Sequence, residues 1–320
     1  MGQGRGTLPS GILKLLYSVR TEEFLAKIAV ELDTTLARRA ANGAPGRAAA
    51  RVLAEGAGWS ISDVVCTSGP QDRLFEEQHS SFCIAIVVAG SFQYRSTLGR
   101  GLMTPGSLLL GNPGQFFECG HEHAMGDRCI SFHYAPDYFE DLAADAGLRG
   151  GKPDFRAVRL PPLRSLSPLV AQVSASLEAS ADQPWEEIGV HLAVQTAKLA
   201  GPFLSGASDV LSSAEARVTR AVRRIEHHPD ERLNLSGLAI EAGLSPYHFL
   251  RTFEHLTGVT PHQYVLRARL REAAMRLTTR PNRVLDIALD CGFGDVSNFN
   301  RAFRAEFGAS PGVYRRQTRR

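Results

Sequence analysis

Long apolar runs are missing from this sequence of 320 residues. Nowhere do about 18 apolar residues follow one another, which argues against a membrane-spanning helix. The first residues, MGQGRGTLPSGILKLLYSVR, also lack the basic start, the continuous apolar stretch and the small-residue cleavage site of a signal peptide. We therefore expect a soluble protein that stays in the cytoplasm and does not enter a membrane.

Cysteine is scarce, and its positions do not suggest pairs. The five cysteines are scattered along the chain, at Cys66, Cys83, Cys119, Cys129 and Cys291. An odd number at such long separations is not the disulfide framework of a small secreted domain, and it favours a reducing compartment. The sequence also lacks a nucleophile elbow and a glycine-rich phosphate loop, which argues against the enzyme classes that depend on them.

Lysine is absent from the last third of the chain, where arginine is abundant. Residues 212–320 contain 18 arginines, no lysine and 11 acidic residues, a net charge of +7. The preceding 211 residues carry 18 basic and 22 acidic residues, a net charge of −4. A basic module on a mildly acidic body favours a protein that binds a polyanion, although a solvated arginine-rich surface has the same composition.

The length allows two domains, and the texture of the sequence changes along the chain. From about residue 59 to 134, short β-branched and aromatic runs alternate with Gly and Pro turns, which predicts an antiparallel barrel or sandwich. Helical periodicity follows at residues 166–179 and 186–199. The small, polar stretch GPFLSGASDVLSS, residues 201–213, is predicted to contain the linker.

An apolar stripe at helical spacing precedes the strands. It predicts a helix over residues 21–41, with Thr21 as the N-cap and Asn42-Gly43 as the stop. The stripe consists of Phe24, Leu25, Ile28, Leu32 and Leu36. This helix either packs against the neighbouring domain or contributes to a dimer.

The last third of the sequence contains an internal repeat. The segments LSPYHFLRTFEHLTGVTPHQY (244–264) and FGDVSNFNRAFRAEFGASPGVY (293–314) match at an offset of 49 residues at their start and, after one extra residue, at an offset of 50. In each copy a short apolar helix ends at a glycine, and a second helix begins at a capping residue, Ser245 or Asp295. Each copy is therefore predicted to be a helix–turn–helix unit. The matched pairs are Phe249 and Phe299, Arg251 and Arg301, Phe253 and Phe303, Gly258 and Gly308, Pro261 and Pro311, and Tyr264 and Tyr314.

The second helices present polar residues that differ between the copies. Arg bonds guanine bidentately and Asn does the same to adenine, at the depth of a major groove. A helical repeat with a phenylalanine core explains the shared positions, but it does not explain the differing ones. We therefore predict that the shared residues build the scaffold and the others read DNA. The predicted DNA-binding residues are Ser245, Tyr247, His248, Leu250, Arg251, Ser297, Asn298, Asn300, Arg301 and Arg304.

One helix is predicted to separate the two units. The stretch from Thr260-Pro261-His262 to about Leu277 predicts a capped helix of roughly 17 residues, about 25 Å long. A rigid spacer of that size holds two reading helices about one DNA turn, ~34 Å, apart on one face of the duplex. If its spacing differs from that of straight DNA, binding bends the duplex.

These residues resemble a known family. The segment from about 214 to 316 is similar to the DNA-binding domain of AraC/XylS-type transcription regulators, through LAIEAGLSPYHFLRTFEHLTGVTPHQY and IALDCGFGDVSNFNRAFRAEFGASPGVYRR. The resemblance implies two helix–turn–helix units whose second helices enter successive major grooves. Leu250 departs from the polar residue often seen at its position, so only apolar contact, such as with a thymine methyl, is expected of it. The base-contacting positions implied are Tyr247, Leu250, Arg251, Ser297, Asn300 and Arg301.

The β-rich region is similar to the cupin-like barrel that such regulators carry for effector binding and dimerisation. PGSLLLGNPGQFFECGHEH (105–123) has Pro-Gly turns between short strands, and the helices within 166–199 match the pair that often makes the dimer. The resemblance implies promoter double-stranded DNA, a small-molecule effector, RNA polymerase and a second copy as partners, with activation as the output.

An α+β fold with two domains is expected as a result. The β domain is a cupin-like antiparallel barrel with flanking helices, and the all-α domain has two helix–turn–helix units joined by a long helix. The predicted boundaries are a helical extension at 1–58, the cupin-like domain at 59–205, a linker at 206–213 and the DNA-binding domain at 214–320.

A motif rich in Cys and His, ECGHEH, lies in the predicted barrel. Strand alternation places Phe117, Cys119, His121 and His123 on one face. Cys and His ligate zinc and other borderline metals, but Cys119 and His123 would lie about 13 Å apart in a straight strand. Cys129 is the candidate third ligand, on a return strand whose register decides whether it meets His123. A bound divalent metal, a thiol switch of Cys119 and Cys129, and a simple cavity lining all remain open.

Two other functions compete with a regulator. A metal-dependent cupin enzyme fused to a DNA-binding domain would use His121, His123 and the later His133, but no Glu follows His123 at the usual short distance. An architectural nucleic-acid protein without an effector would not need so large a β domain. We predict a regulator that is not an enzyme and requires no cofactor.

Overall fold

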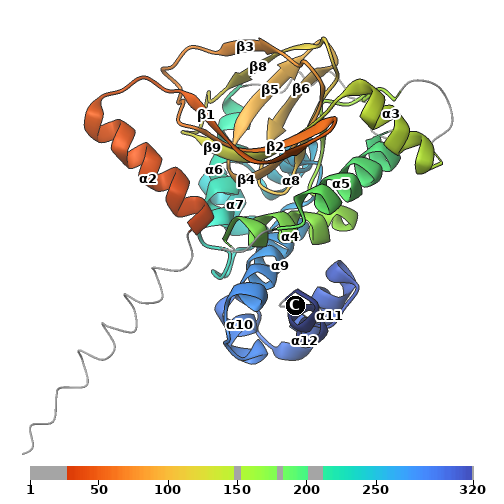
Figure 1. The fold of residues 1–320 in the computed structure, drawn as a ribbon. Helices are drawn as coiled ribbons and strands as arrows, with labels where there is room; N and C mark the ends of the chain where they lie inside the picture. The colour runs from red at the N-terminus through yellow and green to blue at the C-terminus, as the bar shows by residue number, and fades with distance from the viewer. Residues whose placement is uncertain (1–26, 148–152, 179–182, 201–211, 319–320) are drawn as a thin grey trace, which may run out of the picture.

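The computed structural model describes residues 27–147, 153–178, 183–200 and 212–318. A β-rich N-terminal domain occupies the top of Figure 1, and an all-helical C-terminal domain runs from behind it to the bottom. Among the described residues, every helix is too short or too polar to cross a membrane. The strands are β1 (Ala48–Gly56), β2 (Trp59–Cys66), β3 (Phe75–Gln78), β4 (Phe82–Gly90), β5 (Phe92–Ser96), β6 (Gly99–Met103), β7 (Leu108–Gly111), β8 (Phe116–Gly120), β9 (Asp127–Tyr134) and β10 (Arg159–Leu160). The helices of this domain are α2 (Lys27–Asn42), α3 (Pro136–Asp145), α4 (Ser167–Glu178) and α5 (Trp185–Ala200), with a 3-10 turn at Arg164–Leu166.

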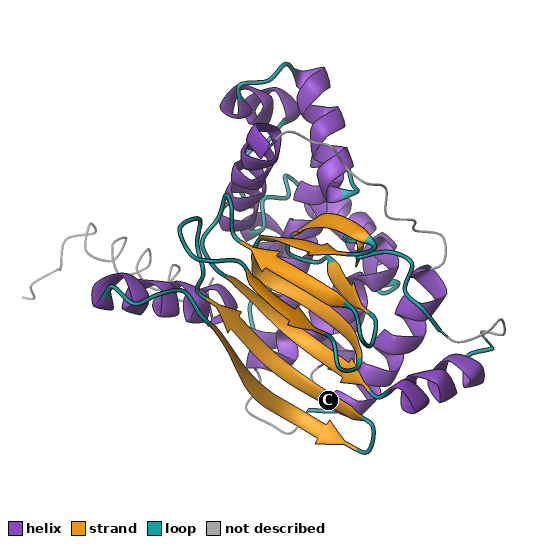
Figure 2. Cartoon of the chain, turned by 90° about the horizontal axis from the view of Figure 1, so that it is seen from above, coloured by secondary structure: helices purple, strands orange, loops and turns teal. Residues whose placement is uncertain are grey.

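The strands form two antiparallel sheets. The larger sheet has the order β1-β2-β9-β4-β7-β10, and the smaller has the order β3-β8-β5-β6. In Figure 2 the strands lie between α2 at the left and α3 at the lower right. The predicted antiparallel β domain is confirmed, but the strands make two sheets rather than one closed barrel.

Strand β4 shows how one sheet serves two cores. Its sequence, FCIAIVVAG, is the continuous apolar run of a strand that is buried on both faces. Cys83, Ala85 and Val87 belong to a cluster with residues of β5, β6 and β8, in the space between the sheets. Ile84 and Ile86 point the other way and pack with residues of α3, α4 and α5. The period of two along the strand therefore separates a cavity side from a helix side.

The beginning of the chain corrects one prediction. Residues 1–58 were expected to be a helical extension, and α2 does follow the apolar stripe to Gly43, whose φ is +60°. Strand β1 also lies in this stretch, paired with β2 at the edge of the larger sheet. Its sequence, AAARVLAEG, is rich in alanine, which is depleted in strands and hides the pattern. Thr21, Phe24 and Leu25 lie outside the described residues.

The two helices predicted after the strands are confirmed as α4 and α5. Helix α5 packs on the larger sheet, where the Tyr134 hydroxyl donates a hydrogen bond of 2.7 Å to the Gly189 carbonyl. Helix α4 lies between the domains. Its Val170 and Val173 belong to the core of the β domain, whereas its Ala171 belongs to the core of the C-terminal domain.

The C-terminal domain consists of two helical units. Most of the predicted linker, residues 206–213, lies outside the described part of the chain, and the first described helix begins at Ser212. The phenylalanines predicted to form the two cores, Phe249, Phe253, Phe299 and Phe303, are fully buried. The helices are α6 (Ser212–His227), α7 (Leu235–Ala242), α8 (Pro246–Thr257), α9 (Pro261–Thr279), α10 (Val284–Asp290), α11 (Val296–Phe307) and α12 (Pro311–Thr318).

The two domains pack directly on each other. Leu102 of β6 is buried in the core of the first unit, and Ala171 of α4 is buried in the core of the second. Arg267 of α9 donates a hydrogen bond of 2.6 Å to the carbonyl of Pro162. Each helical unit is therefore completed by a residue of the β domain, which the sequence pattern does not indicate.

Candidate nucleic-acid interface and ligand cavity

The first helix–turn–helix unit is shaped by local signals. Helix α7 begins after Asn234, whose side chain accepts a hydrogen bond of 2.8 Å from the Gly237 amide, and it ends at Gly243 with a φ of 62°. Helix α8 begins after Ser245, whose hydroxyl accepts a longer hydrogen bond, 3.4 Å, from the His248 amide. Cap, glycine and turn together set the direction in which α8 leaves the unit.

The second unit repeats this plan with a stronger cap. The Asp295 carboxylate accepts a hydrogen bond of 2.7 Å from the Asn298 amide, and a negative charge is favoured at a helix N-terminus. Gly292, at φ 80°, lies against Asp230, whose carbonyl oxygen would be 2.6 Å from an added Cβ atom. Helix α11 ends at Gly308 with a φ of 73°. Glycine is therefore needed at 292 for both conformation and space.

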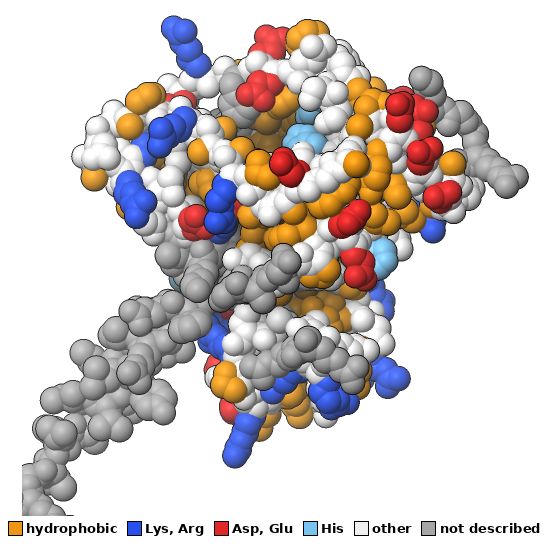
Figure 3. Space-filling view, in the orientation of Figure 1, with side chains coloured by type: hydrophobic (Ala, Val, Ile, Leu, Met, Phe, Trp, Pro, Cys, Tyr) orange, Lys and Arg blue, Asp and Glu red, His pale blue; other side chains and the backbone are white. Residues whose placement is uncertain are grey.

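Most of the predicted reading residues are exposed on α8 and α11. Leu250 is half-buried, and Ser245, which precedes α8, is exposed but engaged as its cap. Among the described residues, Arg251 and Arg301 have no ion-pair partner, so their guanidinium groups are available to a ligand. Figure 3 shows Lys and Arg side chains gathered over the lower, C-terminal part of the molecule. The exposed set is Tyr247, His248, Arg251, Ser297, Asn298, Asn300, Arg301 and Arg304.

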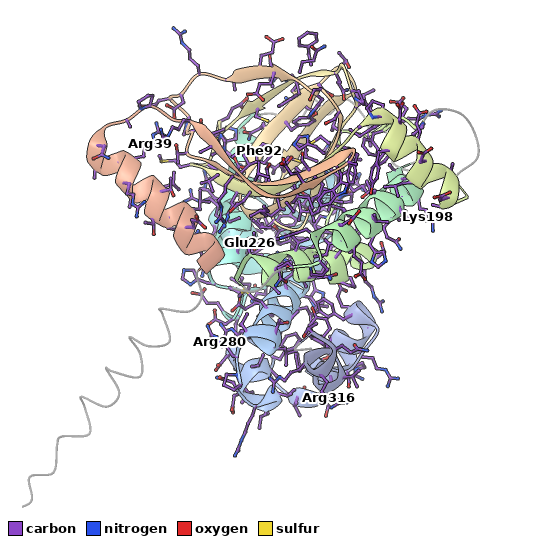
Figure 4. The ribbon with its side chains drawn as sticks, in the orientation of Figure 1. Arg39, Phe92, Lys198, Glu226, Arg280 and Arg316 are labelled. Carbon is purple, nitrogen blue, oxygen red and sulfur yellow. The ribbon has the colours of Figure 1, made fainter. Side chains whose placement is uncertain are left out.

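Helix α9, between the units, is held by contacts that the sequence pattern does not reveal. It has 19 residues, about 28 Å at 1.5 Å per residue, and begins with a capping box at Thr260. Arg271 forms an ion pair of 2.6 Å with Glu226 of α6, and Figure 4 labels Glu226. Arg269 donates a hydrogen bond of 2.6 Å to the Pro229 carbonyl. These long-range contacts fix the first unit on the spacer helix.

A cavity of about 440 Å³ lies between the two sheets. Figure 4 labels Phe92, one of its lining residues, between the strands. Burial lowers the pKa of His79 to about 4, helped by the nearby His133, and burial raises the pKa of Cys83 to about 11. At neutral pH these groups are therefore uncharged. The lining includes His79, His133 and four of the five cysteines: Cys66, Cys83, Cys119 and Cys129.

The ECGHEH motif is arranged differently from the prediction. Strand β8 ends at Gly120, so His121 and His123 do not continue the face of Cys119. Strand β9 pairs with β2 and β4 and not with β8, because residues 121–126 cross to the other sheet. The expected return strand, with Cys129 opposite His123 or its neighbour, was therefore wrong.

The residues of the motif consequently have separate partners. His121 Nε2 lies 2.6 Å from Asp127 Oδ1, and the Cys129 thiol donates to Asp127 Oδ2 at 3.2 Å. His123 Nε2 lies 3.8 Å from a carboxylate oxygen of Glu122. The predicted set of Cys119, His121, His123 and Cys129 is not brought together as one ligand cluster among the described residues.

A different group of ligand atoms is brought together instead. Atoms of Cys66, His121 and Asp127 all lie within 4.8 Å of one another. Sequence reasoning missed Cys66 and Asp127 because they are far apart in the chain. Only the pairing of β2 with β9 places these two residues directly opposite each other.

Comparison with known proteins agrees with this architecture. A model described as a helix-turn-helix domain matches residues 238–317, and a model of the AraC-like ligand binding domain matches residues 64–190. The chain is 30% identical to the HTH-type transcriptional activator RhaS of Klebsiella pneumoniae (strain 342) over 256 residues, which is 76% of this chain and 87% of RhaS.

Two further matches each cover about a third of this chain. The transcriptional regulator Rob of Salmonella typhimurium is 40% identical over 96 residues, 29% of this chain and 32% of Rob, so the chain spans about a third of that relative. The DNA-binding domain of AdpA, solved in complex with a target DNA, is 31% identical, with 32% of this chain and 93% of that chain covered and a TM-score of 0.32.

Fold and site define a two-domain protein, with a β domain around an internal cavity and a helical domain with two exposed, capped second helices. The match to RhaS covers most of both chains and therefore shows the family of this protein. The chain belongs to the AraC family of transcriptional regulators. Because this is a family of regulators and not of enzymes, the alternative of a cupin enzyme is not supported.

Proposed function

We propose that the protein is a sequence-specific regulator of transcription that binds promoter DNA through α8 and α11. The observation that carries this proposal is the repeated, capped helix whose buried positions agree and whose exposed positions differ, apart from the shared Arg251 and Arg301. Arg251 lies on one helix, and Asn300 and Arg301 lie on the other, all exposed. These are the side chains that bond base edges bidentately in a major groove.

The spacer supports recognition of two adjacent grooves by one chain. At about 28 Å, α9 is somewhat shorter than the ~34 Å of one DNA turn, and the rest of the span comes from the units at its ends. A rigid connection of this kind makes the bound duplex adapt to the protein, so we expect DNA bending on binding.

The cavity between the sheets is the proposed effector site. It is lined by neutral imidazoles, thiols and the carboxylate of Asp127, so an uncharged or cationic small molecule suits it better than an anion. RNA polymerase and a second copy of the chain are the further proposed partners, with activation as the output. Helix α4 is enclosed between the domains. Of the two helices, only α5 therefore has an outer face that remains available for a dimer contact.

Selection from random duplexes by the full chain tests this function. We expect enrichment of one motif with two conserved segments about one helical turn apart. Binding to selected and scrambled duplexes, compared by fluorescence anisotropy at physiological salt, should differ by at least ~10³-fold. No enriched motif, with equal affinity for both duplexes, would reduce the protein to a general nucleic-acid binder.

A further inference from the structure

A buried group of three side chains lies at one end of the inter-sheet cavity. Cys66 is the last residue of β2, and Asp127, directly opposite in the ladder, is the first residue of β9. His121 follows β8 of the other sheet. The three residues are 3%, 5% and 3% exposed, respectively, and their ligand atoms all lie within 4.8 Å of one another.

The hydrogen bonding of this group is incomplete. His121 Nε2 is bonded to Asp127 Oδ1, but the other ring nitrogen, Nδ1, is buried without a partner. A buried polar atom without a partner is rare in folded proteins and calls for an explanation.

Asp127 is buried without a lysine or arginine partner in the described part of the chain. Its partners among the described residues are His121 and the Cys129 thiol, and neither lysine nor arginine pairs with it there. The guanidinium of the neighbouring Arg128 is instead paired with Asp63, at 2.8 Å, and with Glu31, at 2.7 Å. Asp127 is buried with no lysine or arginine of the described ranges paired beside it, and a bound metal ion would supply a positive charge at this carboxylate.

We propose that Cys66, His121 and Asp127 bind one divalent metal ion of the zinc type. Thiolate, imidazole and carboxylate are the donors that zinc takes, at ~2.0–2.3 Å from the ion. Atoms now within 4.8 Å of one another would rearrange around the ion, and His121 Nε2 and Asp127 Oδ1, now 2.6 Å apart, would separate. Binding displaces the thiol proton of Cys66 and the proton between His121 and Asp127 to solvent.

This ligand set defines what the ion would do in the fold. Cys66 and Asp127 belong to the larger sheet and His121 follows the smaller one, so the ion ties the two sheets together at one end of the cavity. Cys66, Asp127 and Cys129 all line that cavity. The fourth position is open to Cys129 or to a ligand in the cavity. The proposal does not depend on the DNA-binding function.

Metal analysis of the full chain tests the site. Purified protein is stripped with a chelator, dialysed against zinc and then against metal-free buffer, and measured by elemental mass spectrometry. We expect about one zinc per chain, and affinity lowered by at least ~10-fold in Cys66→Ser and in Asp127→Asn. Cys83→Ser is the matched control, because Cys83 lines the same cavity outside the cluster. Retained zinc in Cys66→Ser, or equal loss in Cys83→Ser, would refute the assignment.

Cobalt provides a readout that does not require a variant to fold. Cobalt(II) bound to the stripped wild-type protein should show the thiolate charge-transfer band and the visible bands of a tetrahedral site with one sulfur ligand. A wild-type protein that takes up neither metal, or a cobalt spectrum without sulfur, overturns the proposal. Duplex binding measured on the same sample separates this failure from a failure of the proposed DNA-binding function.

Discussion

Most side chains that agree between α8 and α11 are buried and most that differ are exposed, whereas Arg251 and Arg301 agree and are both exposed. Phe249 and Phe299 have no exposed surface, whereas Tyr247 is 66% exposed, and its counterpart Ser297 is exposed too. Buried positions are constrained by close packing, so the two copies share them. Exposed positions on these helices are free to match different base pairs.

At the residue scale, Arg301→Ala tests base reading. We expect binding to the selected duplex to weaken by about 1–3 kcal/mol, with discrimination relaxed at one base pair. Titration by fluorescence anisotropy against the selected duplex and single-base variants measures both effects. Arg95→Ala removes the same charge from the β domain and should leave affinity unchanged. An equal loss on random DNA would mean that Arg301 contacts only phosphate.

The buried imidazole of His79 predicts a loss of stability in acid. Its pKa is lowered from 6.5 to about 4, chiefly by burial and also by His133, so between these pH values the unfolded chain binds more protons than the folded one. The free energy of unfolding therefore falls as the pH drops from 6.5 to about 4, by up to about 3 kcal/mol.

Urea denaturation at several pH values measures this effect. His79→Gln, which retains a group able to bond the Tyr94 hydroxyl, should flatten the decline between pH 6.5 and 4. An unchanged slope in the variant would assign the acid sensitivity to other groups.

At the scale of elements, the two caps of the reading helices are unequal. The cap bond of Asp295 is 2.7 Å and charged, whereas that of Ser245 is 3.4 Å and neutral. We expect Asp295→Ala to destabilise the protein by about 1–2 kcal/mol, and Ser245→Ala to cost less. Denaturant titration of both variants measures the difference. If Ser245→Ala costs as much, hydrogen-bond length does not decide the strength of these caps.

Local signals explain which elements the sequence predicts well. The boundaries of α8, α9 and α11 follow from Ser245, Thr260 and Asp295 and from the glycines that end two of these helices. The pairing of β9 depends instead on residues far away in the chain, because Cys129 lies opposite Val64 and Val87. No local pattern shows that residues 121–126 cross between sheets, so the expected cluster around Cys129 was wrong.

At the scale of the whole molecule, the domains share cores. Leu102→Ala removes a buried β6 side chain from the core of the first helix–turn–helix unit, so we expect a loss of about 2–5 kcal/mol and weaker DNA binding. Leu285→Ala is the control and should change stability little, because Leu285 of α10 is 48% exposed. Chemical denaturation monitored on both domains measures the effect. A loss confined to the β domain would show that the helical unit is stable without Leu102.

The second unit is also attached to the β domain. Glu306 of α11, whose side chain is 8% exposed, lies 3.4 Å from Arg267 and bonds the Ser167 hydroxyl at the start of α4. Leu36 of α2 and Met275 of α9 also pack against a small cluster formed by the buried residues Leu32 and Ala89. The β domain and the second reading helix therefore share direct contacts, which the proposed effector response would use.

Footprinting of the selected duplex tests the central claim most directly. The account predicts two protected major-groove segments about one helical turn apart, bound by one chain. In the Arg301→Ala complex, protection should weaken in one segment and persist in the other. A single protected segment, or equal weakening of both, would contradict the assignment of α8 and α11 as two separate reading helices.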